Sequence, residues 1–342
     1  MVSTKKLTAI DLFSGCGGLT QGLKKAGFRV LAAIEINSLA VSTYRMNHPR
    51  VKVLNSDIRK VSAESLRKTV KLKKGQLDLL AACPPCQGFS SLTTKNGKKR
   101  INDERNSLVT DVLKFVGALR PRAIMLENVP GLANKKIFRE FLLQLRVIGY
   151  KTDYRVLDAA DFGVPQRRKR LIMLALIKGQ PIFASANDIQ VTVEDTIKKL
   201  THPLKSMDEL HRVKGEYSER IKILIRHIPA DGGSRRQAGK KFQLQCHIDS
   251  DGFRDIYGRM AWNRVSPTIT GGCINPSKGR FLHPRQHRAI TLREAALLQS
   301  FPLTYKFDLS RGKYAVAEMI GNALPPEFIR QHASAVRKVL RS

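Results

Sequence analysis

The stretch Leu7-Thr8-Ala9-Ile10-Asp11-Leu12-Phe13-Ser14-Gly15-Cys16-Gly17-Gly18 decides the fold. The apolar run from Leu7 to Phe13 predicts a buried strand, and the glycines after it predict a tight turn. A helical pattern follows, and Gly27 is a suitable residue to end it. A strand, a glycine turn and a helix in this order are typical of an α/β sheet that binds a ligand at the turn.

Short apolar runs alternate with helical patterns through the first half of the chain, which predicts a parallel α/β sheet. Further strands are expected at 28–34, 51–54, 77–82, 123–126 and 171–176. Polar or reactive residues recur just after these runs, namely Glu35, Asp57, Cys86 and Glu127. Because open α/β sheets bind their ligands at the carboxyl ends of the strands, this recurrence indicates an active site there.

The regular alternation fades after about Pro181, and a segment rich in Gly, Arg, Lys and His follows. We therefore expect one domain of residues 1–185 plus 305–342, and a smaller irregular domain with its hinge at 186–304. Thr291 and Glu294 are spaced as a capping box and predict the start of a helix.

The composition is that of a globular protein, with 342 residues of which 42% are hydrophobic. No apolar run is long enough to span a bilayer, and the first residues lack the apolar core of a signal peptide, which favours a cytoplasmic protein that binds no membrane. Five cysteines, an odd number, do not indicate a disulfide framework.

The net charge of +33 is the strongest compositional signal. An excess this large predicts a polyanionic partner such as nucleic acid, because each neutralised phosphate releases condensed counterions. A generally basic surface is the alternative.

Cys86 is the candidate nucleophile, since it follows an apolar strand, two prolines precede it and a glycine comes two residues later. Cys83 and Cys86 also match the C-x-x-C spacing of a redox pair or half a zinc site. The surrounding sequence favours neither reading, and we expect no metal; Cys83 is interpreted as a small packed residue at the strand end.

The glycine turn allows a ligand to approach the backbone, and Glu35 lies at the distance where a carboxylate meets ribose hydroxyls. The turn is not G-x-G-x-x-G, so a nucleoside without a pyrophosphate, such as S-adenosyl-L-methionine, fits as well as a dinucleotide. A purely structural turn remains open. So does a structural Glu127 that binds a helix N-terminus. Arg168 and Arg170 either share one face of a strand or lie on a solvated turn.

At this point the chain resembles the DNA (cytosine-5)-methyltransferase family of the bacterial restriction–modification type. The motifs occur in the family's order and span nearly the whole chain: residues 11–18, Pro84-Pro85-Cys86-Gln87, Glu127-Asn128-Val129, Gln166-Arg167-Arg168-Lys169-Arg170, residues 288–302 and Gly321-Asn322-Ala323-Leu324-Pro325-Pro326. The resemblance implies a Rossmann-like methyltransferase sheet with a smaller target-recognition domain.

It also implies a mechanism. The Cys86 thiolate would add to carbon 6 of cytosine, so that carbon 5 can attack the methyl group of S-adenosyl-L-methionine. Glu127 would contact N3 and the exocyclic amine, Arg168 would bind the base carbonyl, and Arg170 would position the Cys86 loop. The base must be flipped out of the duplex, and residues 90–105, hinged at Gly97, are expected to close over it.

The cofactor residues that the resemblance implies surround the methionine, adenosine and ribose of S-adenosyl-L-methionine. They are Phe13, Gly15, Cys16, Gly17, Glu35, Ile36, Asp57, Ile58, Pro85 and Asn322. Asn322 lies near the end of the sequence, so the last helix must return to the first domain.

Double-stranded DNA is the expected partner, with a recognition region at about 188–272 and a possible cognate restriction endonuclease; a monomer is expected. Candidate DNA-binding residues are Gln87, Ser90, Arg235, Arg236, Arg254, Arg259 and Thr268. The arginines would read guanine edges or contact phosphates, and the sequence favours neither. A transfer-RNA methyltransferase and a catalytically silent DNA-binding protein are the alternatives.

Overall fold

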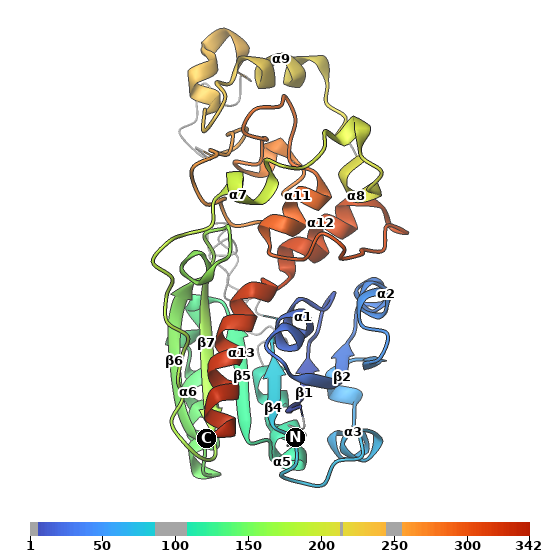
Figure 1. Ribbon diagram of the computed structural model, residues 1–342, viewed down its shortest axis with the longest axis vertical. Helices are drawn as coiled ribbons and strands as arrows, with labels where there is room; N and C mark the ends of the chain where they lie inside the picture. The colour runs from blue at the N-terminus through green and yellow to red at the C-terminus, as the bar shows by residue number, and fades with distance from the viewer. Residues whose placement is uncertain (1–5, 86–107, 213–214, 244–254) are drawn as a thin grey trace, which may run out of the picture. The chain divides into compact units, whose positions relative to one another are not determined.

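The first part of the chain forms a seven-stranded sheet with the strand order β3-β2-β1-β4-β5-β7-β6 (Figure 1). The computed structural model describes residues 6–85, 108–212, 215–243 and 255–342. The strands are β1 (Thr8–Leu12), β2 (Arg29–Glu35), β3 (Lys52–Asn55), β4 (Leu79–Ala82), β5 (Ala123–Asn128), β6 (Lys151–Asp158) and β7 (Lys169–Leu176). All six strands expected from the sequence are present, and the α/β class is confirmed.

The parallel arrangement expected from the sequence holds for only part of the sheet. Strands β1 to β5 are parallel, but β7 runs antiparallel to both β5 and β6. Strand β6 was missed because it lies at the edge of the sheet, where most of its side chains are at least partly exposed and its sequence shows no apolar run. Antiparallel strands at one side of a mostly parallel sheet are common in α/β proteins.

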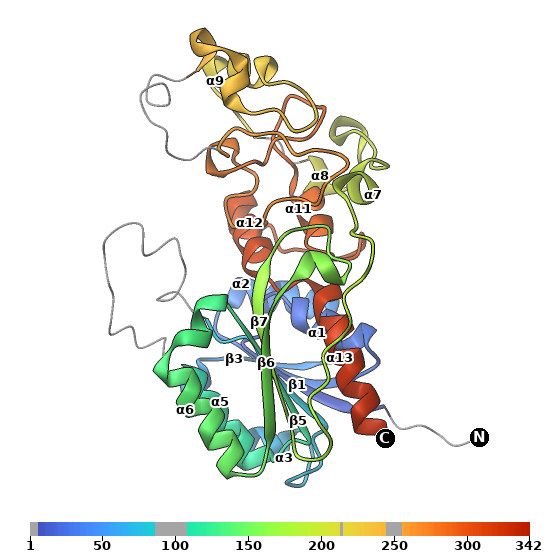
Figure 2. The ribbon, with the colours of Figure 1, turned by 90° about the vertical axis from the view of Figure 1, so that its left-hand side faces the viewer.

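Helices cover both faces of the sheet. They are α1 (Gly18–Lys25), α2 (Ser38–Asn47), α3 (Ala63–Thr69), α5 (Leu108–Leu119), α6 (Lys136–Val147) and α13 (Pro326–Arg341). Figure 2 shows α3, α5 and α6 on one side of the strands, and α1 with α13 on the other.

The last helix returns to the sheet, as expected. A Cβ at Gly22 of α1 would lie 2.5 Å from the Pro326 carbonyl oxygen, so only glycine permits α13 to pack this closely. Arg337 Nη1 also donates a hydrogen bond to the Ala26 carbonyl, 2.8 Å away.

The core lies between the sheet and its helices. Strands β1, β4 and β5 are buried along their whole length, and Phe115, Phe138 and Phe141 of α5 and α6 are fully buried against them. Burying one such side chain contributes about 1.5–3 kcal/mol. The strand ends that carry functional side chains are therefore fixed by a rigid support.

The chain divides into two compact units. The first comprises Met1–Phe162, Lys169–Ala186 and Leu324–Ser342, and the second comprises Gly163–Arg168 and Asn187–Ala323. The second unit thus reaches Ala323, beyond the boundary at 304 expected from the sequence, and α11 packs against α12 within it.

The second unit is built from short helices and turns. Its α-helices are α7 (Val193–Ile197), α8 (Glu209–Arg212), α9 (Glu219–His227), α11 (Leu292–Leu298) and α12 (Gly312–Asn322). The capping box predicted at the start of α11 is confirmed: Thr291 Oγ1 accepts from the Glu294 amide, and Glu294 accepts from the Thr291 amide.

Candidate active site

The order of the strands reverses between β1 and β4, and the candidate site begins at their carboxyl ends. Leu12 pairs with Ala82 at the end of the two strands, and the Cys83 amide donates to the Leu12 carbonyl oxygen at 3.2 Å. The glycine turn after β1 and the loop after β4 therefore start side by side, where open α/β sheets bind their ligands.

The turn after β1 is tight and open on its outer side. Gly15 and Gly17 have φ values of +52° and +98°, a region that favours glycine. The amide of Ser14 donates to the Ile34 carbonyl, which ties the turn to β2. A Cβ at Gly15 would meet no atom within 4 Å among the described residues, so the turn leaves room for a ligand.

Two carboxylates follow the neighbouring strands β2 and β3. Glu35 Oε2 accepts from the Gly15 amide and Oε1 from the Asn37 amide, both at 2.8 Å. Asp57 is bound by Arg59, whose guanidinium lowers the pKa of Asp57 to about 2. Both carboxylates therefore lie on the edge of the sheet that carries the turn, as the sequence suggested.

The remaining cofactor candidates differ in exposure. Ile36 is 65% exposed, whereas Ile58 is buried in the core and offers little surface to a ligand. Cys16 is buried, and burial raises the pKa of its thiol to about 12, which excludes it as a nucleophile at neutral pH. Pro85 is exposed. Asn322 is exposed at the end of α12 in the second unit.

Asp11 is a buried group that the sequence reasoning did not single out. Its Oδ2 accepts from Thr20 Oγ1 at 2.7 Å, and burial raises the pKa of Asp11 to about 7. Asp11 Oδ1 and Ser14 Oγ are buried, and neither has a hydrogen-bond partner within the described part of the chain. Unsatisfied polar atoms beside an open turn indicate a place where a polar ligand or water binds.

Glu127 lies at the centre of a second group, at the carboxyl end of β5, and is only 3% exposed. Arg170 Nε of β7 lies 3.0 Å from Glu127 Oε1, and the Cys83 thiol donates to Oε2 at 2.9 Å. The adjacent Asn128 donates from Nδ2 to the Pro84 carbonyl oxygen at 3.1 Å. Glu127 and Asn128 therefore both hold the segment that leads into Cys86.

Several candidates fall outside the described residues. These are Cys86, Gln87 and Ser90, with the loop of residues 90–105 expected to close over the base, and also Arg254.

The role expected of Arg168 is not supported by its position. Its guanidinium is buried in the second unit and donates to the carbonyl oxygens of Ile269, Gly321 and Ala323 at 3.0–3.3 Å. Carbonyls at the end of a helix need such donors, because they have no partner within the helix. Arg170, by contrast, contacts the Glu127 carboxylate.

Two of the candidate DNA-reading arginines are buried. Arg259 is 0% exposed and donates to the carbonyl oxygens of Ile225, Ile228, His283 and Gln286. Arg235 is 1% exposed. This burial fits neither base reading nor phosphate contact, the two roles expected from the sequence, because an enclosed guanidinium has no surface to offer to DNA.

The other two DNA-binding candidates that the structure describes are Arg236 and Thr268, and both are at least partly exposed. Arg236 is exposed. Thr268 is half-buried, and its hydroxyl donates to the Arg167 carbonyl oxygen at 2.6 Å, so its proton is not directed at a phosphate.

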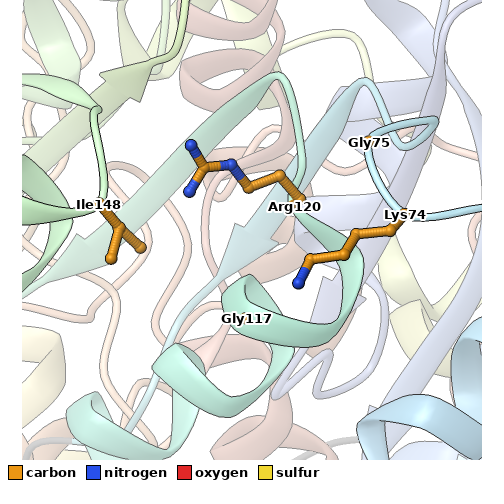
Figure 3. A pocket seen from close by; sticks show the side chains of 5 residues that line it. All are labelled: Lys74, Gly75, Gly117, Arg120 and Ile148. Atoms are coloured by element: carbon orange, nitrogen blue, oxygen red, sulfur yellow. The ribbon is translucent and has the colours of Figure 1, made fainter.

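A concavity of about 440 Å³ lies away from these groups, beside the loop that precedes β4 and the end of α5. Figure 3 shows the cationic side chains of Lys74 and Arg120 in it. None of the candidate active-site residues lines this concavity.

Within the described ranges, no helix is long and apolar enough to cross a membrane. The same residues contain no group of three or more His, Cys, Asp or Glu side chains placed to hold a metal ion.

The chain is similar to DNA methylases over almost its whole length. The family described as C-5 cytosine-specific DNA methylase matches residues 7–338. The type II methylase M.HgiDII of Herpetosiphon aurantiacus is 33% identical over 97% of this chain and 95% of its own length. The type II methyltransferase M1.HphI of Haemophilus parahaemolyticus is 32% identical over 99% of this chain and 89% of its own length.

Solved structures agree on the fold. The Entamoeba histolytica methyltransferase EhMeth superposes with a TM-score of 0.69 and 16% identity, over 99% of this chain and all of its own. The Dnmt2 methyltransferase of S. pombe gives a TM-score of 0.64 and 19% identity, also over 99% and 100%. At these identities the likeness shows the fold alone.

Proposed function

Because the chain belongs to the C-5 cytosine-specific DNA methylase family, we propose that Cys86 is its nucleophile and S-adenosyl-L-methionine its methyl donor. The observation that supports this most directly is the Glu127 group. A buried carboxylate bound by a cation and a thiol holds the segment that ends, one residue past Pro85, at Cys86. The enzyme methylates carbon 5 of cytosine in DNA, and duplex DNA is its proposed substrate.

S-adenosyl-L-methionine suits the turn after β1. The open side of Gly15 leaves space for it, and the carboxylates of Glu35 and Asp57 are suited to the ribose hydroxyls and the adenine amine. The unsatisfied oxygens of Asp11 and Ser14 provide further acceptors for its polar groups. When bound, it supplies a methyl group on a positively charged sulfur.

Cys86 would activate the base. Its thiolate forms a bond to carbon 6 of cytosine, and the electron pair of the 5,6 double bond moves to make carbon 5 nucleophilic. After carbon 5 has accepted the methyl group, a base removes the carbon 5 proton. The double bond then re-forms as Cys86 leaves as a thiolate. Carbon 6 is inaccessible within stacked DNA, so the cytosine must be flipped out.

Glu127 and Arg170 would bind the flipped cytosine. The Glu127 carboxylate can accept a hydrogen bond from the exocyclic amine, and from N3 once N3 carries a proton. That proton neutralises the negative charge that the ring gains when the thiolate adds. Arg170 replaces Arg168 as the proposed donor to the base carbonyl, because its Nη2 makes no hydrogen bond within the described part of the chain. Arg168 instead fixes the turn at Gly321 to Ala323.

The second unit is the proposed target-recognition part. Its α9 helix contributes Leu224 and Ile225 to a small apolar cluster that also includes Ala238. Exposed cations on α9 and the two turns that pack against it include Arg220, Arg226, Arg236 and Lys241, while the exposed Lys222 pairs with Glu219. We propose that these four residues, called the α9 basic surface, contact DNA phosphates in place of the buried Arg235 and Arg259.

The similar type II enzymes also suggest a partner. A restriction endonuclease that cuts the same sequence would need this methylation to spare the host DNA, and we propose the enzyme acts as a monomer beside it. The transfer-RNA alternative gains no support from these relatives, which are type II methylases.

Bisulfite sequencing tests the proposal. DNA from a methylation-free host that expresses the protein should contain protected cytosines within one short sequence. DNA from the same host expressing Cys86→Ala should contain none. Protection that persists with Cys86→Ala would refute the nucleophile, and unmodified DNA beside methylated RNA would support the transfer-RNA alternative.

A further inference from the structure

Cys83 is a polar group at the candidate site that the mechanism above does not use. The sequence suggests only a small packed residue, yet its sulfur lies 2.9 Å from Glu127 Oε2. Two parallel strands bring them together: Ala82, the last residue of β4, pairs with Leu126 of β5, and Cys83 and Glu127 are the next residues.

The geometry fixes the direction of this hydrogen bond. The thiol hydrogen points at Oε2, and a carboxylate oxygen is an acceptor. Burial and the Glu127 carboxylate raise the pKa of the Cys83 thiol well above its ordinary value. The sulfur therefore keeps its proton at neutral pH and is the donor.

We propose that Cys83 is a positioning residue for the Glu127 carboxylate, an inference that rests on the proposed function. The Cys83 thiol hydrogen-bonds one oxygen, and the Arg170 guanidinium forms an ion pair with the other at 3.0 Å without a hydrogen bond, so both neighbours restrict rotation of the carboxylate about its last bond. Because its two neighbours restrain it, the Glu127 carboxylate is already oriented when the flipped cytosine arrives. It therefore does not have to reorganise during the reaction. Each oxygen retains lone pairs with which to accept hydrogen bonds from the base.

Three variants separate positioning from packing. Cys83→Ala removes the donor, Cys83→Ser keeps a donor of similar size, and Cys273→Ala is the matched control. Cys273 is buried in the second unit, and burial raises the pKa of its thiol to about 12.

The first measurement is steady-state methylation of a duplex that contains the recognition sequence. Cys83→Ala should lower kcat about tenfold, as expected for one lost hydrogen bond to a charged group, with little change in KM for S-adenosyl-L-methionine. Cys83→Ser should recover most of kcat, and Cys273→Ala should match the parent enzyme. An unchanged kcat in Cys83→Ala, or equal losses in the alanine and serine variants, would overturn the proposal.

The second measurement does not depend on activity. The S–H stretch of Cys83, identified as the infrared band lost in Cys83→Ala, should lie at lower frequency than that of Cys273. It should move up in Glu127→Gln, because an amide oxygen is a weaker acceptor than a carboxylate. If the frequency of the Cys83 band were the same in Glu127→Gln as in the parent enzyme, the hydrogen bond would be contradicted. If the parent enzyme fails to methylate cytosine while the band shifts, the proposed function fails and the hydrogen bond stands.

Discussion

Arg170 and Glu127 form an ion pair across two antiparallel strands, with Nε of Arg170 3.0 Å from Oε1 of Glu127. The carboxylate is 3% exposed, so the cation offsets part of the cost of burying its charge. Strand β7 is thus more than a structural addition to the parallel sheet. It delivers a cation beside a buried carboxylate at the carboxyl end of β5.

Removing either member of this pair should slow the chemical step. We expect Glu127→Gln and Arg170→Ala each to lower kcat by about 10²–10³, the usual effect of losing one preorganised electrostatic group. Binding of S-adenosyl-L-methionine, measured by calorimetry, should change little. Asp153→Asn, which neutralises an exposed carboxylate on β6, is the control and should retain full activity.

Arg168 should behave differently from Arg170. Arg168→Ala leaves the carbonyls of Ile269, Gly321 and Ala323 without this donor, which should lower the free energy of unfolding by at least about 2 kcal/mol. Thermal denaturation measures this loss. Equal melting temperatures for the parent and Arg168→Ala would show that the buried guanidinium does not stabilise the fold.

The α9 basic surface should determine part of the salt dependence of DNA binding. Arg226→Ala and Arg236→Ala should each reduce the slope of log K against log salt by about 1, as expected for one lost phosphate contact. Lys74→Ala removes the same charge from the concavity in Figure 3 and serves as the control. A slope that falls equally in all three variants would mean that only the net charge of +33 matters.

Arg259 offers the opposite test. It donates to four carbonyl oxygens within the second unit, and we expect Arg259→Met to lower the melting temperature. At a temperature where the variant stays folded, the salt slope should equal that of the parent. A smaller slope of log K against log salt in the folded variant would show that Arg259 does contact DNA.

Asp11 predicts a pH dependence of stability. Its pKa is raised from 3.8 to about 7, so the folded protein holds a proton that the unfolded chain has lost between those values. The stabilisation is therefore complete below about pH 4 and is lost as the pH rises towards 7. At about 1.4 kcal/mol for each pH unit, the loss is on the order of 4 kcal/mol at most.

Comparison with Asp11→Asn isolates the contribution that protonation of Asp11 makes to stability, because asparagine can still accept the Thr20 hydrogen bond. Burial lowers the pKa values of three histidines to about 4, so their contribution to stability rises with pH between about pH 4 and 6.5, opposite to that of Asp11. They are His48, His283 and His332. The melting temperature of the parent minus that of the variant should fall from pH 4 to 7. A constant difference would show that Asp11 is ionised throughout.

The sequence alone predicted which polar residues lie at the strand ends, but it did not predict which arginines are buried. The strand before the glycine turn, Glu35 and Glu127 follow from apolar runs that end in polar residues, a pattern set by local burial. Whether Arg259 is exposed depends on carbonyls tens of residues away. No pattern within the surrounding sequence reveals such a long-range partner, so the composition suggested a surface residue.

The sequence did not reveal strand β6 or the hydrogen bond of Cys83, for related reasons. An edge strand needs no continuous apolar face, so the exposed residues of β6 give a weak signal. The hydrogen bond from Cys83 depends on the register of β4 with β5, which places it beside a residue 44 positions away.

A covalent bond between Cys86 and carbon 6 of cytosine is the central claim. The direct test uses a duplex in which the target cytosine carries fluorine at carbon 5. The fluorine cannot leave as a proton does, so the adduct should persist after methyl transfer. Mass spectrometry should find the methylated, fluorinated base attached to the peptide that contains Cys86, with no adduct in Cys86→Ala. A methylated product without any trapped protein, or an adduct on Cys83, would contradict the account.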